Sequence, residues 1–148
     1  MRRLLAVLAL LVLGLAACAE PNGEIDLSDV RLAEPTGPNA ALYFTVTPGV
    51  ADRLLGAETD VAASIRIHET VTGADGTMGM QPVESLEVGS GETLTLEPGG
   101  FHLMLMDAER LQVGDEVEIT LIWEEAGEQT VVAEVVEPAD AMNHDDDG

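Results

Sequence analysis

Alternating apolar and polar positions dominate the chain after residue 24. Residues 41–47 alternate up to Pro48-Gly49, and in residues 64–68 isoleucines alternate with serine, arginine and histidine. A period of two places successive side chains on opposite faces of a β-strand. Further strands are expected at residues 25–32, 54–58, 79–83, 93–96, 101–106, 116–123 and 131–136.

Glycine-containing turns separate these segments, at residues 73–76, 89–91, 98–100 and 125–127. Many short strands at this spacing predict an all-β fold, a single-domain antiparallel β-sandwich. The domain is expected to cover residues 25–137, with no helix after the N-terminal segment. Residues 138–148 are rich in aspartate and are expected to form an acidic, disordered tail.

The N-terminus has the pattern of a processing segment. Two arginines precede an apolar run over residues 4–15, which predicts a signal peptide over residues 1–17. Cys18 follows Ala16-Ala17, as in the bacterial lipoprotein box, so we expect Cys18 to be lipidated and residues 18–24 to include a short spacer. The alternatives are ordinary secretory cleavage and an uncleaved span. A lipid anchor predicts an extracytoplasmic protein, on the periplasmic face or outer cell surface.

The charge of the chain is strongly negative. Six arginines and no lysine face 28 acidic residues, a formal charge of −22. This charge argues against nucleic acid and against adhesion to anionic lipid heads, so the only membrane contact expected is the anchor. It favours either a partner with a basic surface or simple solubility.

Four soft donors carry the candidate chemistry: His68, Met80, His102 and Met104. Thioether and imidazole ligands suit Cu(I), whereas calcium and magnesium require oxygen. Cys18 is the only cysteine, so the mature domain has no thiolate for a blue-copper or structural zinc site and no motif for covalent haem.

Strand geometry brings some of these donors together. His102 and Met104 share a face about 6 to 7 Å apart, with Met106 next in line. The strand expected over residues 64–68 ends at His68, which predicts a place at the rim of the sandwich. Met78 lies two residues before Met80 on the same face.

Each of these residues also has an ordinary explanation. A single histidine is often a surface residue, and methionine often fills gaps in a core. Met78 and Met106 are therefore assigned to packing or, at most, to accessory copper ligation. Other residues with ordinary explanations are the core aromatics Tyr43, Phe44, Phe101 and Trp123, and Met142 and His144 of the solvated tail.

The spacing of the donors resembles that of the periplasmic PCuAC copper chaperones. That family is described by a histidine, an optional methionine, ten residues, a methionine, 21 residues and His-x-Met. His68, Met80, His102 and Met104 meet every spacing, and the similarity extends over residues 25–137. Glu69 occupies the optional methionine position, which removes a possible accessory donor.

The resemblance implies a cupredoxin-like sandwich that binds one Cu(I) per chain in an exposed site. It further implies that the ion passes to an oxidase subunit carrying the dinuclear CuA centre of cytochrome c oxidase, or to another copper carrier. No enzyme is expected, because the chain has no nucleophile elbow, phosphate loop or His-Glu-x-x-His helix.

Two other functions remain open from the sequence. One is a copper-buffering or resistance lipoprotein that uses the same site without delivering copper to oxidase. The other is a metal-free scaffold lipoprotein, which predicts that Met80 and Met104 are buried and that His68 is distant from His102.

Overall fold

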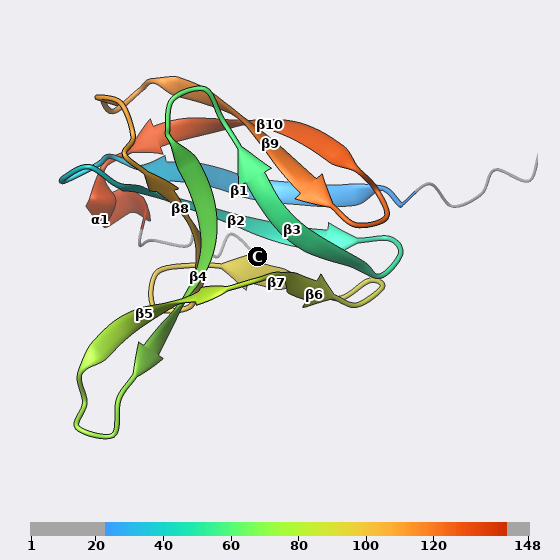
Figure 1. Ribbon diagram of the computed structural model, residues 1–148. Coiled ribbons are helices and arrows are strands. Elements are labelled where there is room, and N and C mark those ends of the chain that lie inside the picture. The colour runs from blue at the N-terminus through green and yellow to red at the C-terminus, as the bar shows by residue number, and fades with distance from the viewer. Residues whose placement is uncertain (1–22, 142–148) are drawn as a thin grey trace, which may run out of the picture.

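The computed structural model describes residues 23–141. Ten strands and one short helix follow one another along the chain (Figure 1). The strands are β1 Ile25–Ala33, β2 Ala40–Pro48, β3 Asp52–Glu58, β4 Ser64–Thr72, β5 Met78–Val83, β6 Leu86–Val88, β7 Leu94–Leu96, β8 Phe101–Met106, β9 Glu116–Trp123 and β10 Glu128–Val136, and the helix is α1 Pro138–Ala141. Within residues 23–141, no helix is long and apolar enough to cross a membrane.

All ten strands belong to one hydrogen-bonded sheet that folds over on itself. The strand order is β5-β4-β8-β2-β1-β10-β9-β3-β6, and β7 pairs with β2 beside β8. Every pairing is antiparallel except that of β1 with β10, which joins the first and last strands of the domain. The predicted all-β sandwich is confirmed, and its strands are antiparallel as expected except for this one pair.

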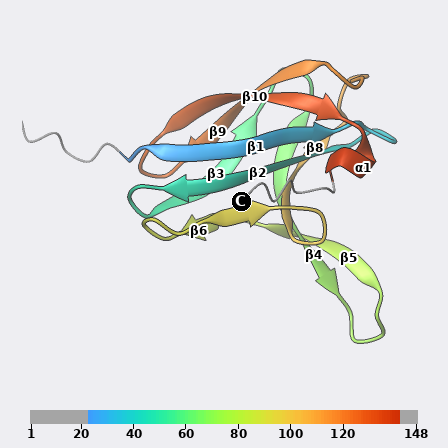
Figure 2. The same cartoon turned by 180° about the vertical axis from the view of Figure 1, so that it is seen from behind.

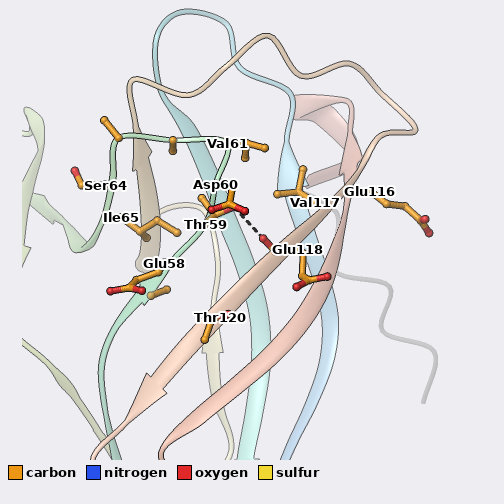
Figure 3. Close-up of a pocket in the computed structure, with 13 residues that line it drawn as sticks. Glu58, Thr59, Asp60, Val61, Ser64, Ile65, Glu116, Val117, Glu118 and Thr120 are labelled. Atoms are coloured by element: carbon orange, nitrogen blue, oxygen red, sulfur yellow. Dashed lines mark hydrogen bonds between the residues drawn. The ribbon is translucent and has the colours of Figure 1, made fainter.

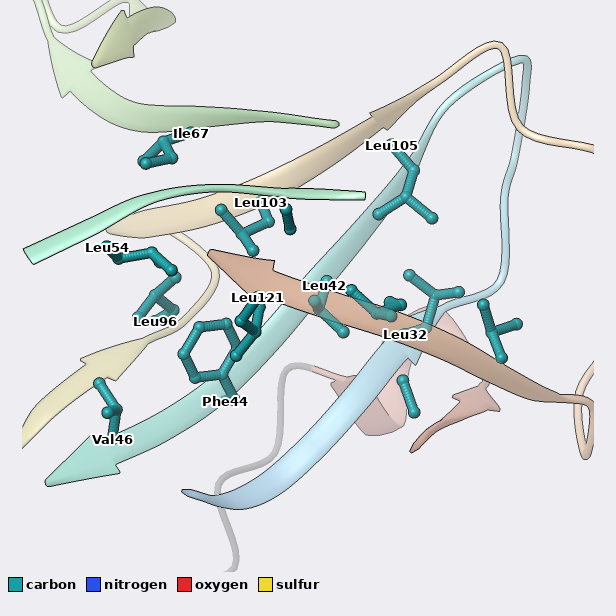
Figure 4. Close-up of a cluster of buried hydrophobic side chains, with 14 of the residues drawn as sticks. Leu32, Leu42, Phe44, Val46, Leu54, Ile67, Leu96, Leu103, Leu105 and Leu121 are labelled. Atoms are coloured by element: carbon teal, nitrogen blue, oxygen red, sulfur yellow. The ribbon is translucent and has the colours of Figure 1, made fainter. Parts of the chain in front are cut away.

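The core lies between the two layers made by this folding (Figure 4). β2 shows the alternation most clearly, because Leu42, Phe44 and Val46 are buried while the residues between them are only half-buried. Ile67 of β4 and Leu103 of β8 face the same core from neighbouring strands. The outer faces of β4 and β8 are therefore left for polar and sulfur-containing side chains.

The β4–β5 hairpin projects from the body of the sandwich in both views (Figures 1 and 2). Its turn places Gly76 at a φ of 81°, a conformation that favours glycine. The Asp75 carboxylate accepts hydrogen bonds from the Thr77 backbone N–H, 3.1 Å, and from the Thr77 hydroxyl, 2.7 Å. These bonds fix the turn that brings β5 back along β4.

Two elements were not expected from the sequence. β6 is only three residues long, too short to show an alternation, and is defined by its pairing with β3. Helix α1 forms from the first four residues of the segment expected to be a disordered tail. Ala141 is buried, and its carbonyl accepts a hydrogen bond from Arg31 Nε at 3.1 Å, so tertiary contacts stabilise this single turn.

Residues 1–22 and 142–148, which include the expected signal peptide, Cys18 and the rest of the tail, lie outside the described residues.

Asp52 connects the start of β3 to the turn between β9 and β10. Its carboxylate accepts backbone hydrogen bonds from Arg53 at 2.7 Å, Glu125 at 3.0 Å and Ala126 at 2.9 Å. Burial by itself would raise the pKa of Asp52, but these backbone donors outweigh burial and lower it. The ionised carboxylate is therefore the form that stabilises the fold.

Replacing Asp52 with alanine should lower the free energy of unfolding at neutral pH by about 2 to 3 kcal/mol, because buried backbone donors would lose a charged acceptor. The folded pKa lies below the unfolded value, so this contribution is present above the unfolded pKa and is lost as the pH falls through the folded pKa. Urea unfolding at neutral pH and near pH 2.5 measures both effects. Asp26→Ala, at an exposed position, is the control, and a difference between wild type and Asp52→Ala that persists undiminished at acid pH would contradict this role.

Candidate metal site

The two expected histidine ligands lie side by side. His68 of β4 is directly opposite His102 of β8 in the antiparallel register, and their ring centroids are 5.7 Å apart in a nearly perpendicular arrangement. His68 Nδ1 and His102 Nε2 are buried without a hydrogen-bond partner. Buried polar atoms nearly always have a partner, so these two nitrogens are available to bind a metal ion.

The expected position of His68 at the end of its strand is wrong. β4 continues to Thr72, which places His68 at the middle of the strand. Pairing with β5 extends the strand, since His68 is opposite Pro82 and the pairing continues to Thr72. The hairpin projects from the core, so the alternation of apolar and polar residues that marks β4 up to His68 does not continue beyond it.

The two expected methionine ligands flank the histidine pair on the same face. Met80 is opposite Thr70 of β4, and Met104 is opposite Arg66. Each methionine is thus one step of two residues from the histidines, about 7 Å along the strand, within reach of a long side chain. Met80 is 60% exposed and Met104 is half-buried. The metal-free alternative predicts two buried methionines and distant histidines, whereas here Met80 is exposed and the histidines lie opposite each other.

Met78 and Met106 lie farther from the histidines on this face. They are opposite Thr72 and Ser64, two steps from His68 in either direction, or about 14 Å along β4. Neither is close enough in register to complete a compact site around the histidine pair.

Glu69 faces the other side of the hairpin. It is opposite Gln81, whose Nε2 donates a hydrogen bond of 3.1 Å to the Glu69 carboxylate. Residue 69 therefore contributes nothing to the face of His68. Phe101, the neighbour of His102, also lies on this opposite face and packs against the core.

His102 is held by the backbone of the preceding turn. Its Nδ1 lies 3.3 Å from the carbonyl oxygen of Gly100, which also accepts the backbone N–H of Thr70 at 3.0 Å. When Nδ1 carries the proton and donates a hydrogen bond to this carbonyl, Nε2 has a free lone pair that can bind a metal ion. Burial lowers the pKa of His102, the Gly100 carbonyl partly opposes this, and the charge of His68 lowers it further. A neutral imidazole is thereby favoured, which is the form that binds metal.

Tyr43, an expected core residue, is instead a neighbour of the site. Its ring centroid is 6.3 Å from that of His102, and its side chain is half-buried on the outer face of β2. The alternation in β2 could have shown this, because Leu42 and Phe44 point inward. Burial raises the pKa of Tyr43 and Arg31 partly opposes this, so the phenol stays protonated beside the histidines. The expected core positions of Phe44 and Trp123 are confirmed.

Two cavities differ sharply in their relation to the site. A cavity of about 200 Å³ lies beside it, between the sheet and α1, with Met104, Tyr43 and Ala141 in its lining. A cavity of about 790 Å³ is lined by residues 57–65 and the start of β9 (Figure 3). Its lining includes Asp60 and Glu118 but no histidine or methionine, so it is unrelated to the candidate site.

The described residues contain no alternative site built from the usual hard and borderline ligands. No group of three or more histidine, cysteine, aspartate or glutamate side chains within residues 23–141 is arranged to hold a metal ion. The candidate site therefore depends on its methionines. Cys18, Met142 and His144 are outside the described residues.

Comparisons with known proteins identify the family of the chain. Residues 25–135 match the model of the family "Putative lipoprotein LpqE-like". The chain is 31% identical over 142 residues to the curated "Putative lipoprotein Lxx21020" of Leifsonia xyli subsp. xyli, and the match covers 86% of this chain and 85% of that protein.

Solved structures with the same fold carry copper in their descriptions. The copper-bound PCuAC domain from PmoF2 matches with a TM-score of 0.65 and 29% identity, over 78% of this chain and 95% of that one. The solution structure of Cu(I)-DR1885 from Deinococcus radiodurans matches with a TM-score of 0.60 and 34% identity, over 82% and 83% of the two chains. From these matches, the chain belongs to the LpqE-like family and has the cupredoxin-like fold of the PCuAC domains.

Proposed function

We propose that this chain binds one Cu(I) ion through His68, His102, Met80 and Met104 and transfers it to another protein outside the cytoplasm. The observation that carries the proposal is the register of β5, β4 and β8, which gathers these four residues on one face. The two buried ring nitrogens without partners support it, because a bound ion would supply what they lack.

The chemistry of the donors explains the choice of metal. All four ligands are neutral when His102 and His68 are deprotonated, so bound Cu(I) keeps its single positive charge. Thioethers are soft ligands that bind Cu(I) but hold zinc, calcium and magnesium poorly. Neutral ligands can also be exchanged one at a time with those of an acceptor. A site that is partly exposed at Met80 suits transfer better than permanent storage.

The proposed recipient is a respiratory oxidase subunit that carries the dinuclear CuA centre, or another copper carrier. The solved structures described as a copper-bound PCuAC domain and as Cu(I)-DR1885 support copper as the cargo. The lipoprotein descriptions of the family and of the Leifsonia protein support lipidation of Cys18 and an extracytoplasmic location. We assign the chain no catalytic activity.

Titration of the full chain, purified in mild detergent, against a Cu(I) chelator of known affinity should give one tightly bound ion. His102→Ala and Met104→Ala should each weaken binding by at least about 100-fold, because loss of a group that merely orients a ligand already costs about 10- to 100-fold. The measurement is the chelator's absorbance at equilibrium. Absence of stoichiometric binding, or full affinity in both variants, would exclude the proposed site.

Glu69→Met provides a matched test of the face assignment. It introduces the methionine of the PCuAC pattern at a position that points away from His68, where Glu69 pairs with Gln81. The Cu(I) affinity should therefore change by less than about threefold, well under one step of 1.4 kcal/mol. A marked gain in affinity in the same chelator competition would show that residue 69 reaches the ion.

Delivery and buffering are separated by deleting the gene. If the protein supplies oxidase, the deletion strain should lose copper from its CuA centre at ordinary copper levels, and the wild-type gene should restore it. Metal analysis of the purified oxidase and growth in excess copper measure the two functions in parallel. Fully loaded oxidase together with copper sensitivity would instead indicate the buffering function.

A further inference from the structure

The sulfur and nitrogen donors flank β4 in a line of register positions that is longer than the proposed site, with Met78 and Met80 on β5 and His102, Met104 and Met106 on β8. Each residue of β4 on this face has a donor opposite it at successive steps of about 7 Å. The donors opposite β4, in order from the tip of the hairpin, are Met78, Met80, His102, Met104 and Met106. The line therefore continues past Met80 to the projecting end of the hairpin (Figure 1).

Packing does not explain Met78. Its side chain is 69% exposed, the largest exposed fraction among the exposed large hydrophobic residues of the described chain, and it is absent from the core cluster and from the residues packed against it. Methionine is normally useful because it fills apolar gaps, and an exposed methionine forgoes that stabilisation. Met106, at the other end of the line, is half-buried.

Met78 and Met80 are placed to hold one ion together. They lie two residues apart on one face, and their unbranched side chains have three rotatable bonds each. Two sulfurs with bonds of about 2.3 Å to a common ion need to approach within about 4.6 Å of each other, which flexible side chains about 7 Å apart can do. Met78 is about 14 Å along the strand from the histidines, too far to complete their site.

We propose that Met78 and Met80 form a second, transient Cu(I) site, from which the ion leaves the protein. This inference rests on the proposed function. The Cu–S bond to Met78 forms as the bonds to Met104, His68 and His102 break one at a time, while Met80 remains bound throughout. No proton or electron is transferred, and the ion keeps its single charge. Ligands of the acceptor then fill the open positions at the exposed tip of the hairpin.

Met78→Leu tests this step because it removes the sulfur with little change in volume at an exposed position. The full chain in detergent is loaded with one Cu(I) and mixed with bicinchoninate coupled to dextran, an acceptor too bulky to enter the protein. We expect the equilibrium affinity to stay within about twofold of wild type and the transfer rate to fall about tenfold, equivalent to about 1.4 kcal/mol in the activation barrier. Met106→Leu, the same substitution at the other end of the line, should leave the rate unchanged.

The possible outcomes distinguish this inference from the proposed function. If the wild-type chain binds no Cu(I), both the proposed function and the second site at Met78 and Met80 are excluded. If binding is tight but wild type and Met78→Leu transfer Cu(I) at equal rates, only the second site is excluded. An affinity that falls as much as the rate would make Met78 a resident ligand, and a slow Met106→Leu with a normal Met78→Leu would place the departure at the opposite end. Thermal unfolding of each variant verifies that the fold is intact.

Discussion

The candidate site depends on the antiparallel register of β4 with its two neighbours. His68 meets His102 across one pair of strands, while Thr70 meets Met80 across the other. A shift by one residue in either pairing would turn a whole set of side chains to the opposite face. The hydrophobic core fixes this register, because Ile67 and Leu103, the sequence neighbours of the two histidines, must remain buried on the inner face. The hydrophobic interior thus determines which donors meet on the outside.

The turns add a second level of control. The Gly100 carbonyl binds both the Thr70 N–H and His102 Nδ1, so the same atom joins β4 to the turn before β8 and orients one imidazole. At the outer edge, β5 contains Pro82, which cannot donate a backbone hydrogen bond. Proline is common in edge strands because it discourages pairing with another chain. The hairpin can therefore expose its methionines without offering a complete strand edge for aggregation.

Much of the fold was predictable because its core strands alternate strictly. Phe44, Leu103 and Leu121 lie on inward positions that the pattern identifies. The expected glycine turn at residues 73–76 does end β4, although β4 runs four residues beyond its expected end at His68. β6 and α1 were not predictable, since a three-residue strand and a single helical turn depend on distant partners such as Arg31. For the site, the two-residue period of a strand correctly predicted that His102 and Met104 share a face. The same period could have placed Tyr43 outside the core, because Leu42 and Phe44 on either side of it point inward. The contact between His68 and His102 could not be derived from local pattern, because it requires the pairing of strands more than 30 residues apart.

The short helix at the end of the domain has a practical consequence for anyone who handles this protein. Arg31 holds Ala141 against the sheet, where Ala141, Tyr43 and Met104 line the same small cavity. An extended chain covers at most about 3.6 Å per residue, so a segment joined within a few residues after Ala141 starts near this cavity. An affinity tag of histidines fused there would start within reach of the proposed copper ligands and compete with them. Metal-binding data from C-terminally tagged protein therefore need an untagged comparison.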